Sequence, residues 1–340
     1  MGESMVFASI SLRMRVDVEA MNMVESVGNY SRHRIVPIII QENNGSEGVS
    51  YDLMYLPAIS GQSLTNAFSR ALADTVIRRN HPICDTCKKY EEIGGFPKRP
   101  ILADNDSIDK RVNECIIEDV TGFMATKGQE GERGAAIRRT SKIWFSYMVP
   151  DADTVKHSPP IPQFHVRYGK ENEQMIYTIE SGSAIYRIMV GIDVDGIGRL
   201  INGNYVNDRD KRIDDVFDAL ILMFNGYLGA KKARYLPQVE FLGGIAAISH
   251  PYRFMVSPAK AKLINDKLIP WYLTDTLIRA EKFVEIFNDI DALQLYYFDN
   301  EFNTILQTKS EKLKIEKATN FEDLITKVKN AVIRSFIQKK

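Results

Sequence analysis

The sequence has few cysteines, no excess charge of either sign and no long apolar run. Three cysteines in 340 residues cannot build a disulfide scaffold and are typical of a reducing compartment. No window approaches about 18 uncharged apolar residues, and Arg13 interrupts the first apolar stretch, which argues against a membrane span and a signal peptide. We therefore expect a cytoplasmic protein that makes no contact with a membrane.

The charges of the chain cancel, because it carries 44 basic and 44 acidic residues. A freestanding nucleic-acid-binding protein usually has a basic balance, so the total counts against one. The placement is uneven, however, with acid concentrated in 104–119 and base in 32–34, 133–142 and 231–234. Segregated charge can form a basic groove on a neutral molecule.

Hydrophobic periodicity indicates both strands and helices. Apolar and polar residues alternate over 8–20, which predicts a long strand with one buried and one solvated face in an antiparallel sheet. The same alternation returns at 184–195. Apolar stripes predict a helix that begins near Ser60 and a second over about 210–228, and a last core strand at 239–256 contains a Gly-Gly pair typical of a bulge.

The order strand–helix–insertion–strand–strand–helix–strand predicts an α+β fold with a ferredoxin-like, or modified RNA-recognition-motif, core and large insertions. We divide the chain into a discontinuous palm core (1–79 plus 141–257), an inserted lobe (80–140) and a C-terminal α/β extension (258–340). The extension should contain a helix, the hairpin "LQLYYFDNEFNTILQT" and a final helix. Within 150–183, "QFHVRYG" and "MIYTI" predict another hairpin.

The segment "NMVESVGNYSRHR" (22–34) combines a glycine, neutral donors and three basic side chains directly after the first strand. Gly28 frees the backbone for close approach, and loop amides can bind phosphate oxygens. Arg32 and Arg34 add positive charge, and the neighbouring asparagine and serine are donors that contact sugar and phosphate without reading sequence. The plain alternative is a solvated loop in which Glu25 pairs with an arginine.

Two further segments have donors or cations beside a helix end. Ser60 and Gly61 either cap the first helix or offer its free amides to an anion. The cations of "GYLGAKKARYLP" (226–237) either complement a helix dipole or contact a passing polyanion. The solvated faces of 8–20 and 184–195 lack the stacking aromatics of a typical RNA-recognition motif, so loops and insertions would have to bind any RNA.

Signals for catalysis and for metal binding are sparse. A metal-independent ribonuclease needs a general base, for which His33 and His165 are the candidates. No second histidine or lysine lies at a spacing that would indicate a catalytic pair. Paired carboxylates, a nucleophile elbow and a Walker-type loop are missing. In "HPICDTC" (81–87), the residue types and spacing suit a zinc half-site, a redox dithiol or unbound thiols. The candidate zinc ligands are His81, Cys84, Cys87 and Cys115.

Four segments together resemble the DevR-type family of CRISPR-associated proteins, most closely its type I-A branch. They are "SLRMRVDVEAMNMVESVGNYSRHRIVPIII", "YLPAISGQSLTNAFSRAL", "QFHVRYG" and "GAKKARYLPQVEF". The specific features are an N-x-x-E-S-x-G-N loop after the first strand and Ser-Gly before the first helix. The resemblance covers most of residues 5–256, whereas the insertion and the C-terminal third match only loosely.

The resemblance implies a non-catalytic backbone subunit of a type I CRISPR interference (Cascade) complex. Such subunits have a modified RNA-recognition-motif palm with inserted lobes and form a helical filament along the guide RNA. They bind its sugar–phosphate backbone and leave the bases free to pair with target DNA, while a thumb-like hairpin of a neighbouring subunit displaces a base. Guide RNA, target DNA reached through the guide, other Cascade subunits and further copies of this chain are therefore the expected partners.

Transferred to this sequence, the resemblance implies RNA contacts by residues of the first loop, the first helix start, the central strand and the basic segment, with additional contacts from the inserted lobe. These residues are Asn22, Glu25, Gly28, Asn29, Ser31, Arg32, His33, Arg34, Ser60, Gly61, Ser63, Arg138, Arg139, His165, Arg167, Lys231, Lys232 and Arg234. We expect no cofactor other than the candidate structural zinc.

Two alternatives to the scaffold function stay open. Related type III subunits cut target RNA with an aspartate in the loop after the first strand, but between Asn22 and Ile35 this chain has Glu25 and no aspartate, so we predict no nuclease activity. The first alternative is nevertheless a guide-processing endoribonuclease that uses His33 or His165. The second is a DNA-binding autoregulator, suggested by the historical name of the family, although nothing in the sequence resembles a helix-turn-helix.

Overall fold

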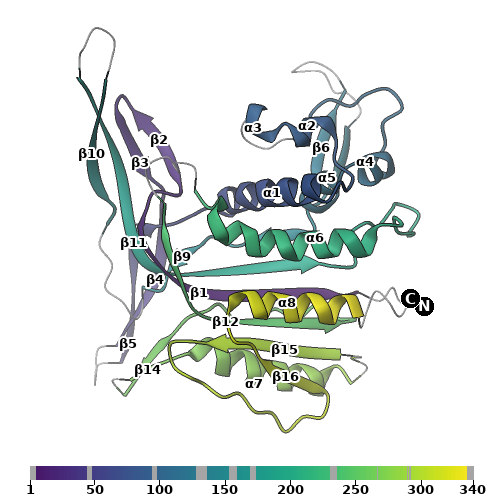
Figure 1. Cartoon of the computed structure of the whole chain (residues 1–340). Helices are drawn as coiled ribbons and strands as arrows, with labels where there is room; N and C mark the ends of the chain where they lie inside the picture. The colour runs from purple at the N-terminus through teal and green to yellow at the C-terminus, as the bar shows by residue number, and fades with distance from the viewer. Residues whose placement is uncertain are drawn as a thin grey trace.

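The computed structural model describes residues 5–43, 48–93, 98–127, 136–152, 159–168, 174–229, 236–265, 267–288, 290 and 292–334. One large mixed sheet of ten strands runs through the molecule (Figure 1). Its strands are β1 (Phe7–Glu19), β2 (Met23–Val27), β3 (Tyr30–His33), β8 (Ile143–Phe145), β9 (Val149–Pro150), β10 (Ile161–Tyr168), β11 (Gln174–Asp193), β12 (Gln238–His250), β15 (Ala292–Asp299) and β16 (Leu313–Lys317).

The strand order of this sheet is β16-β15-β12-β1-β11-β3-β2, and β8, β9 and β10 also pair with β11. The β11–β3 and β15–β16 pairs are parallel and the others are antiparallel, which makes the sheet mixed. Three two-stranded sheets lie outside it. They are β4 (Ile35–Asn43) with β5 (Val49–Pro57), β6 (Phe123–Thr126) with β7 (Ala136–Arg139), and β13 (Lys262–Ile264) with β14 (Lys267–Ile269).

Helices cover both faces of the large sheet (Figure 1). The α-helices of the described residues are α1 (Gly61–Arg78), α2 (Asp85–Lys88), α3 (Tyr90–Ile93), α4 (Ile108–Glu114), α5 (Ile116–Thr121), α6 (Arg209–Leu222), α7 (Trp271–Ile286) and α8 (Phe321–Val332), of which α2, α3 and α4 lie away from the sheet. The main core lies between α1, α6 and α8 and the apolar face of β1, where Ile10, Leu12 and Met14 are buried. A second core forms between α7 and the opposite face of β12 and β15, with Leu273 and Leu295 inside it.

Several sequence predictions are confirmed. The strand at 8–20 is β1, and its neighbours β11 and β12 are antiparallel to it. Helix α1 begins after Ser60, whose hydroxyl accepts a hydrogen bond from the Ser63 amide at 3.2 Å. The register of β12 shifts opposite Arg13, at the predicted Gly-Gly bulge. "QFHVRYG" and "MIYTI" form a hairpin, in which the second strand is part of the 20-residue β11.

The prediction of a solvated face on β1 is wrong for most of its length. Ser9, Ser11 and Arg13 are buried, because the chain that follows β12 crosses this face. The hydroxyl of Ser9 donates to the carbonyl of Phe254 at 2.9 Å and accepts from the amide of Val256 at 3.2 Å. The segment that follows β12 therefore covers the face that the alternation assigned to water.

The predicted hairpin "LQLYYFDNEFNTILQT" is also wrong. Its first half forms β15, but β15 pairs with β12 and with β16, which begins only at Leu313. The carboxylate of Asp299 accepts hydrogen bonds from the amides of Glu301, Phe302 and Thr304. These bonds turn the chain away from β15 into a loop, so the second half of the motif forms no strand.

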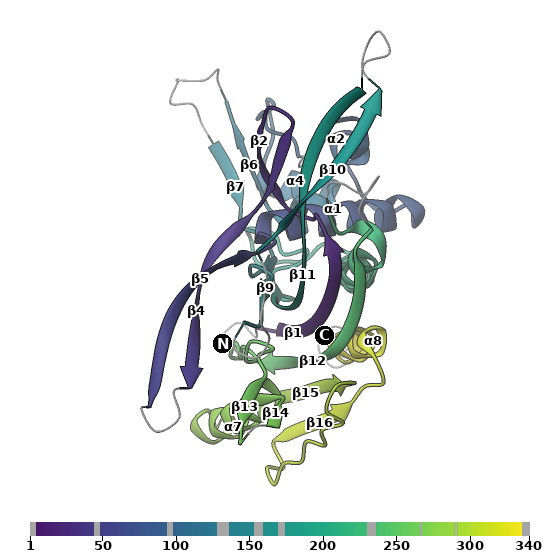
Figure 2. The same cartoon turned by 90° about the vertical axis from the view of Figure 1, so that its left-hand side faces the viewer.

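Two long hairpins extend from the body of the molecule, β10–β11 at one end and β4–β5 at the other (Figures 1 and 2). One face of β4–β5 packs Ile38, Ile40 and Leu56 against Val149. No helix in the described ranges combines the length and the apolar character that a membrane span requires.

Candidate nucleic-acid interface

The structure joins the first predicted loop to the start of α1. The side chain of Asn22 is buried, and its Oδ1 accepts a hydrogen bond from the amide of Ser60 at 2.8 Å. The carbonyl of Asn22 accepts from the amide of Arg34 at 2.8 Å, which closes the base of the loop. Asn22 therefore holds two of the predicted segments together.

The loop itself is a short hairpin formed by β2 and β3. Gly28 occupies its turn at φ +58°, a backbone conformation that glycine adopts without strain. The carbonyl of Asn29 accepts from the amide of Thr178 at 2.7 Å, and β3 continues as a parallel neighbour of β11. The hydroxyls of Ser26 and Ser31 lie 3.1 Å apart. The β2–β3 hairpin thus lies beside the β10–β11 hairpin (Figure 1).

His33 does not face the solvent with the rest of the loop. Its side chain is buried, and its Nε2 lies 2.7 Å from Oε1 of Glu19, which also accepts a hydrogen bond from Tyr186 at 2.7 Å. Burial disfavours the charged ring, but the contact with Glu19 outweighs it and raises the pKa of His33 above its usual value. We therefore assign His33 a structural role instead of the predicted RNA contact.

Stability should depend on pH through this pair. A raised folded-state pKa means that the contribution of His33 is fully present below about pH 6.5, the ordinary histidine value, and is lost as pH rises through the higher folded value. We expect urea unfolding across pH 6 to 9 to show this loss in the native chain and not in His33→Gln. His165→Gln, at a half-buried histidine of β10, is the matched control and should keep the native slope. Equal slopes in native protein and His33→Gln would contradict the assignment.

Glu180 and Tyr30 belong to the same region but were outside the predicted set. The carboxylate of Glu180 accepts from the Tyr30 hydroxyl and, at 2.7 Å, from the backbone amide of His33. In sequence, Glu180 is 150 residues from Tyr30 and 147 residues from His33. No local pattern could have identified this contact.

The Ser-Gly motif at the start of α1 has a packing explanation. A Cβ on Gly61 would lie 2.5 Å from the carbonyl oxygen of Phe145, so α1 could not approach β8 with a larger residue there. Ser63 is half-buried and its amide is bonded to Ser60. These contacts account for the motif as a helix cap and a close helix–strand approach.

His165 and Arg167 lie on β10 in the extended hairpin. The ring of His165 stacks on Tyr177 with centroids 5.2 Å apart, whereas Arg167 is exposed. The same strand exposes large aromatic side chains, with Phe164 at 75% and Tyr168 at 82% of their full accessible surface. The hairpin therefore exposes cationic and aromatic groups that a ligand could contact.

Lys231, Lys232 and Arg234 lie outside the described residues, as does the side chain of Glu25. The chain that leads into the basic segment is described, however. Arg70 of α1 donates a hydrogen bond to the carbonyl of Tyr227 at 2.6 Å. A Cβ on Gly229 would lie 3.3 Å from Met21, next to Asn22. The last described residue before the basic segment, Gly229, therefore lies beside the first loop.

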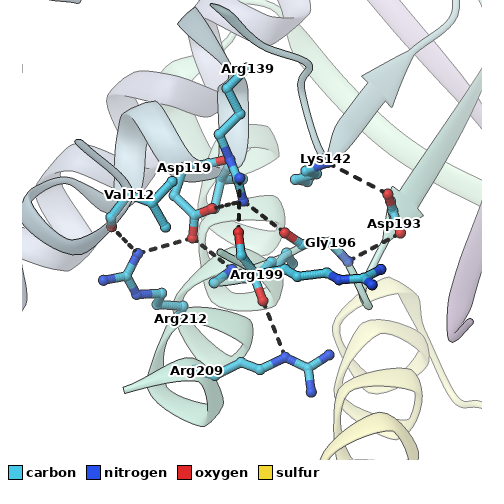
Figure 3. A network of polar contacts seen from close by, with 12 residues as sticks. Val112, Asp119, Arg139, Lys142, Asp193, Gly196, Arg199, Arg209 and Arg212 are labelled. Atoms are coloured by element: carbon cyan, nitrogen blue, oxygen red, sulfur yellow. Dashed lines mark hydrogen bonds and ion pairs between the residues drawn. The ribbon is translucent and has the colours of Figure 1, made fainter. Parts of the chain in front are cut away.

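The two arginines predicted in the inserted lobe have different surroundings. Arg138 is exposed on β7. Arg139 bonds to the carboxylate of Asp119 and to the carbonyls of Gly196 at 2.8 Å and Arg199 at 3.0 Å (Figure 3). The structure thus uses the Arg139 guanidinium to hold the inserted lobe on the turn after β11, and we no longer count it as an RNA contact.

The three cysteines converge, as expected of a metal site. The Sγ atoms of Cys84, Cys87 and Cys115 all lie within 4.8 Å of one another, and we call these residues the three-cysteine cluster. Such a cluster could hold a metal ion. The prediction of His81 as a fourth ligand is wrong, because the ring is outside the cluster and its Nδ1 lies 2.6 Å from the buried carboxylate of Asp215.

Comparison with known proteins adds the family. Residues 10–268 match the model of the family described as "CRISPR-associated negative auto-regulator DevR/Csa2". "CRISPR-associated protein Cas7/Csa2 1" of Saccharolobus solfataricus is 34% identical over an alignment of 257 residues, and the match covers 69% of this chain and 76% of that protein. "CRISPR-associated aCascade subunit Cas7/Csa2 2" of the same organism is 28% identical over an alignment of 318 residues, and the match covers 86% of this chain and 91% of that protein.

Solved structures share the fold. A chain of a "CRISPR RNA-guided surveillance complex" superposes with a TM-score of 0.51 at 11% identity, covering 96% of this chain and 99% of that one. A chain of the same kind of complex, titled "pre-nicking", gives a TM-score of 0.54 with the same coverage and identity. The family model covers well over half of the residues, and the mixed-sheet architecture agrees with it. The chain belongs to the DevR/Csa2 family of CRISPR-associated proteins.

Proposed function

We propose that this chain is a non-catalytic backbone subunit of a type I CRISPR interference complex. It binds guide RNA along the sugar–phosphate backbone and associates with further copies of itself as a helical filament. One observation supports this most: the β2–β3 hairpin, the start of α1 and the β10–β11 hairpin, predicted from three separate segments, lie together. The bond from Ser60 to Asn22 and the pairing of β3 with β11 hold them there.

The arrangement of the central strands supports a modified RNA-recognition-motif core. In order across the sheet, β12, β1 and β11 are followed by β8 and β9, while α1 and α6 pack on one face. This is the neighbour order expected when a β-α-β-β-α-β unit folds into a ferredoxin-like sheet. The palm is then 1–79 plus 141–257, with 80–140 as the inserted lobe and 258–340 as the extension over the second face.

The covered second face also explains why RNA would bind at loops. A typical RNA-recognition motif stacks bases on the open face of its sheet. Here Ser9 is buried under the segment that follows β12, and buried Arg13 contacts Glu301 of the C-terminal extension. The groups left for a polyanion are those of the β2–β3 hairpin, the β10–β11 hairpin as the thumb, and the cations of 231–234.

Removing exposed cations from this surface should weaken RNA binding without sequence preference. We expect Arg32→Ala with Arg167→Ala to reduce the affinity for unrelated single-stranded RNAs by similar factors. The slope of log affinity against log salt should fall by about 1.4, or about 0.7 for each lost phosphate contact. Fluorescence anisotropy at several salt concentrations measures both quantities.

Lys282→Ala with Lys314→Ala is the matched control, because it removes two exposed cations from α7 and β16, far from the two hairpins (Figure 1). It should leave the salt slope unchanged. A loss confined to one RNA sequence would contradict backbone binding. Electron microscopy of the chain mixed with guide RNA tests the filament separately, and the absence of any regular assembly would argue against that part.

The non-catalytic assignment has its own test. Of the two histidines considered for an endoribonuclease, His33 is buried against Glu19 and His165 is stacked on Tyr177. RNA incubated with the chain should therefore stay full-length. Discrete products that disappear in His165→Ala would establish the processing enzyme instead, and preferential binding of one DNA duplex over RNA would favour the autoregulator.

A further inference from the structure

We propose that the three-cysteine cluster binds one structural zinc ion through three thiolates, with a water molecule as the fourth ligand. All three cysteines of the 340-residue chain belong to this cluster. They come from two separate segments, one containing Cys84 and Cys87 and the other Cys115 at the junction of α4 and α5. Thiolates are the ligands that zinc prefers among protein side chains, together with imidazole.

The geometry of the cluster fits zinc. With Zn–S bonds of about 2.3 Å, three sulfurs of a tetrahedron lie about 3.8 Å apart, and the observed separations are all within 4.8 Å. The backbone already holds the two segments together, since the amide of Ile116 donates to the carbonyl of Pro82 at 3.0 Å. The backbone amide of Cys87 also bonds to the sulfur of Cys84, and that of Cys84 to the sulfur of Cys115. Amide donors of this kind stabilise thiolates.

The charge around the cluster fits as well. Three thiolates and Zn²⁺ sum to a charge of minus one. Lys98 interacts electrostatically with Cys87 and Cys115, and its Nζ donates to the carbonyl of Thr121 at 2.9 Å. Its positive charge balances the remaining negative charge. The neighbouring Arg99 is already paired with Glu114 and Glu118.

A metal ion would also explain how the start of the inserted lobe is held. Helices α2 and α3 have four residues each, which is too short for a helix to be stable without tertiary contacts. The buried Cys87 of α2 and Cys115 before α5 point to a common centre. Zinc at that centre would fasten α2 to α5. The ion would thus stabilise the lobe and take no part in RNA binding.

Metal analysis of the full chain, expressed and purified without chelators, tests the proposal. We expect about one equivalent of zinc in the native chain and less than a tenth in Cys115→Ser. Two controls should keep the full equivalent: Met124→Ser, an exposed sulfur-containing residue of the same lobe, and His81→Ala, which separates this ligand set from one that includes the histidine. Loss of zinc in His81→Ala would overturn the three-thiolate site.

A second measurement uses only the native chain, in case Cys115→Ser fails to fold. A zinc chelator should lower the melting temperature and expose three reactive thiols, and added Zn²⁺ should reverse both effects. Folded native protein that contains less than a tenth of an equivalent of zinc after incubation with Zn²⁺ would overturn the proposal. So would a mass two hydrogens below that of the reduced chain, because it would reveal a disulfide within the cluster.

Discussion

Replacing Arg13 with methionine is expected to lower the free energy of unfolding by about 3–5 kcal/mol. Arg13 lies in the middle of β1 and is completely buried. Its Nη1 bonds to the carboxylate of Asp151, and its Nε donates to Glu301 at 2.7 Å. Without the guanidinium, the fully buried carboxylate of Asp151 and the partly buried carboxylate of Glu301 lose this partner, and we expect the loss to cause the destabilisation.

Arg15→Met is the matched control, because it lies two residues further along the same face of β1. Its side chain is 56% exposed and pairs with Asp17 at 2.8 Å. Exposed pairs contribute little, so this change should cost no more than about 0.5 kcal/mol. Urea denaturation measures both variants.

A double-variant cycle sharpens the test of Arg13. Adding Glu301→Gln to Arg13→Met should cost less than the sum of the two single changes, because the second change removes one of the stranded charges. Equal small losses in Arg13→Met and Arg15→Met would contradict the buried ion pair. Since Glu301 belongs to the C-terminal extension, the result also measures how firmly that extension is attached to β1.

Asp119→Ala in the inserted lobe should have a comparable effect. The buried carboxylate of Asp119 bonds to Arg139, to Arg212 at 3.0 Å and to the amide of Gly198 at 2.8 Å (Figure 3). Its removal takes a buried carboxylate partner from Arg139 and leaves Arg212 paired with Asp208 alone among the described carboxylates. We expect a loss of about 3–5 kcal/mol in the free energy of unfolding, measured by urea denaturation.

The matched control for this variant is Asp104→Ala in the same lobe. The side chain of Asp104 is 90% exposed and pairs with Lys127 at 2.9 Å, so its loss should change stability by no more than about 0.5 kcal/mol. If Asp119→Ala costs no more than Asp104→Ala, the network does not anchor the lobe. At temperatures where Asp119→Ala stays folded, its affinity for RNA should equal that of the native chain, because we assign Arg139 to the contact with Asp119 and not to an RNA contact.

Elements with a strong local period could be predicted from the sequence. The apolar residues of β1 and the apolar stripe of α1 each define one buried face. Such a face can be predicted because it depends only on residues close together in sequence. The Gly-Gly bulge of β12 could likewise be predicted from the sequence, but the contact that requires glycine there could not. A Cβ on Gly243 would lie 2.3 Å from the hydroxyl of Tyr272, a residue of α7.

The candidate interface could be predicted only in part. The segments that approach one another were identified, but the function of single side chains was not. From the linear sequence, Arg139 and His33 are expected to be solvated cations. In the structure, Arg139 pairs with the carboxylate of Asp119, and His33 contacts that of Glu19. His81 has the spacing of a zinc ligand, yet it faces Asp215.

The family, the main helices and strands, and the set of cysteines could be inferred from residue order and short-range period alone. Which polar groups are buried could not, because burial is a property of the folded chain. The alternation in β1 assigns Arg13 and Arg15 to the same face, and no local property distinguishes them. Glu301, 288 residues away, pairs with Arg13, while Arg15 remains at the exposed end of the strand. Burial depends on segments that cross from distant parts of the chain, and periodicity contains no information about them.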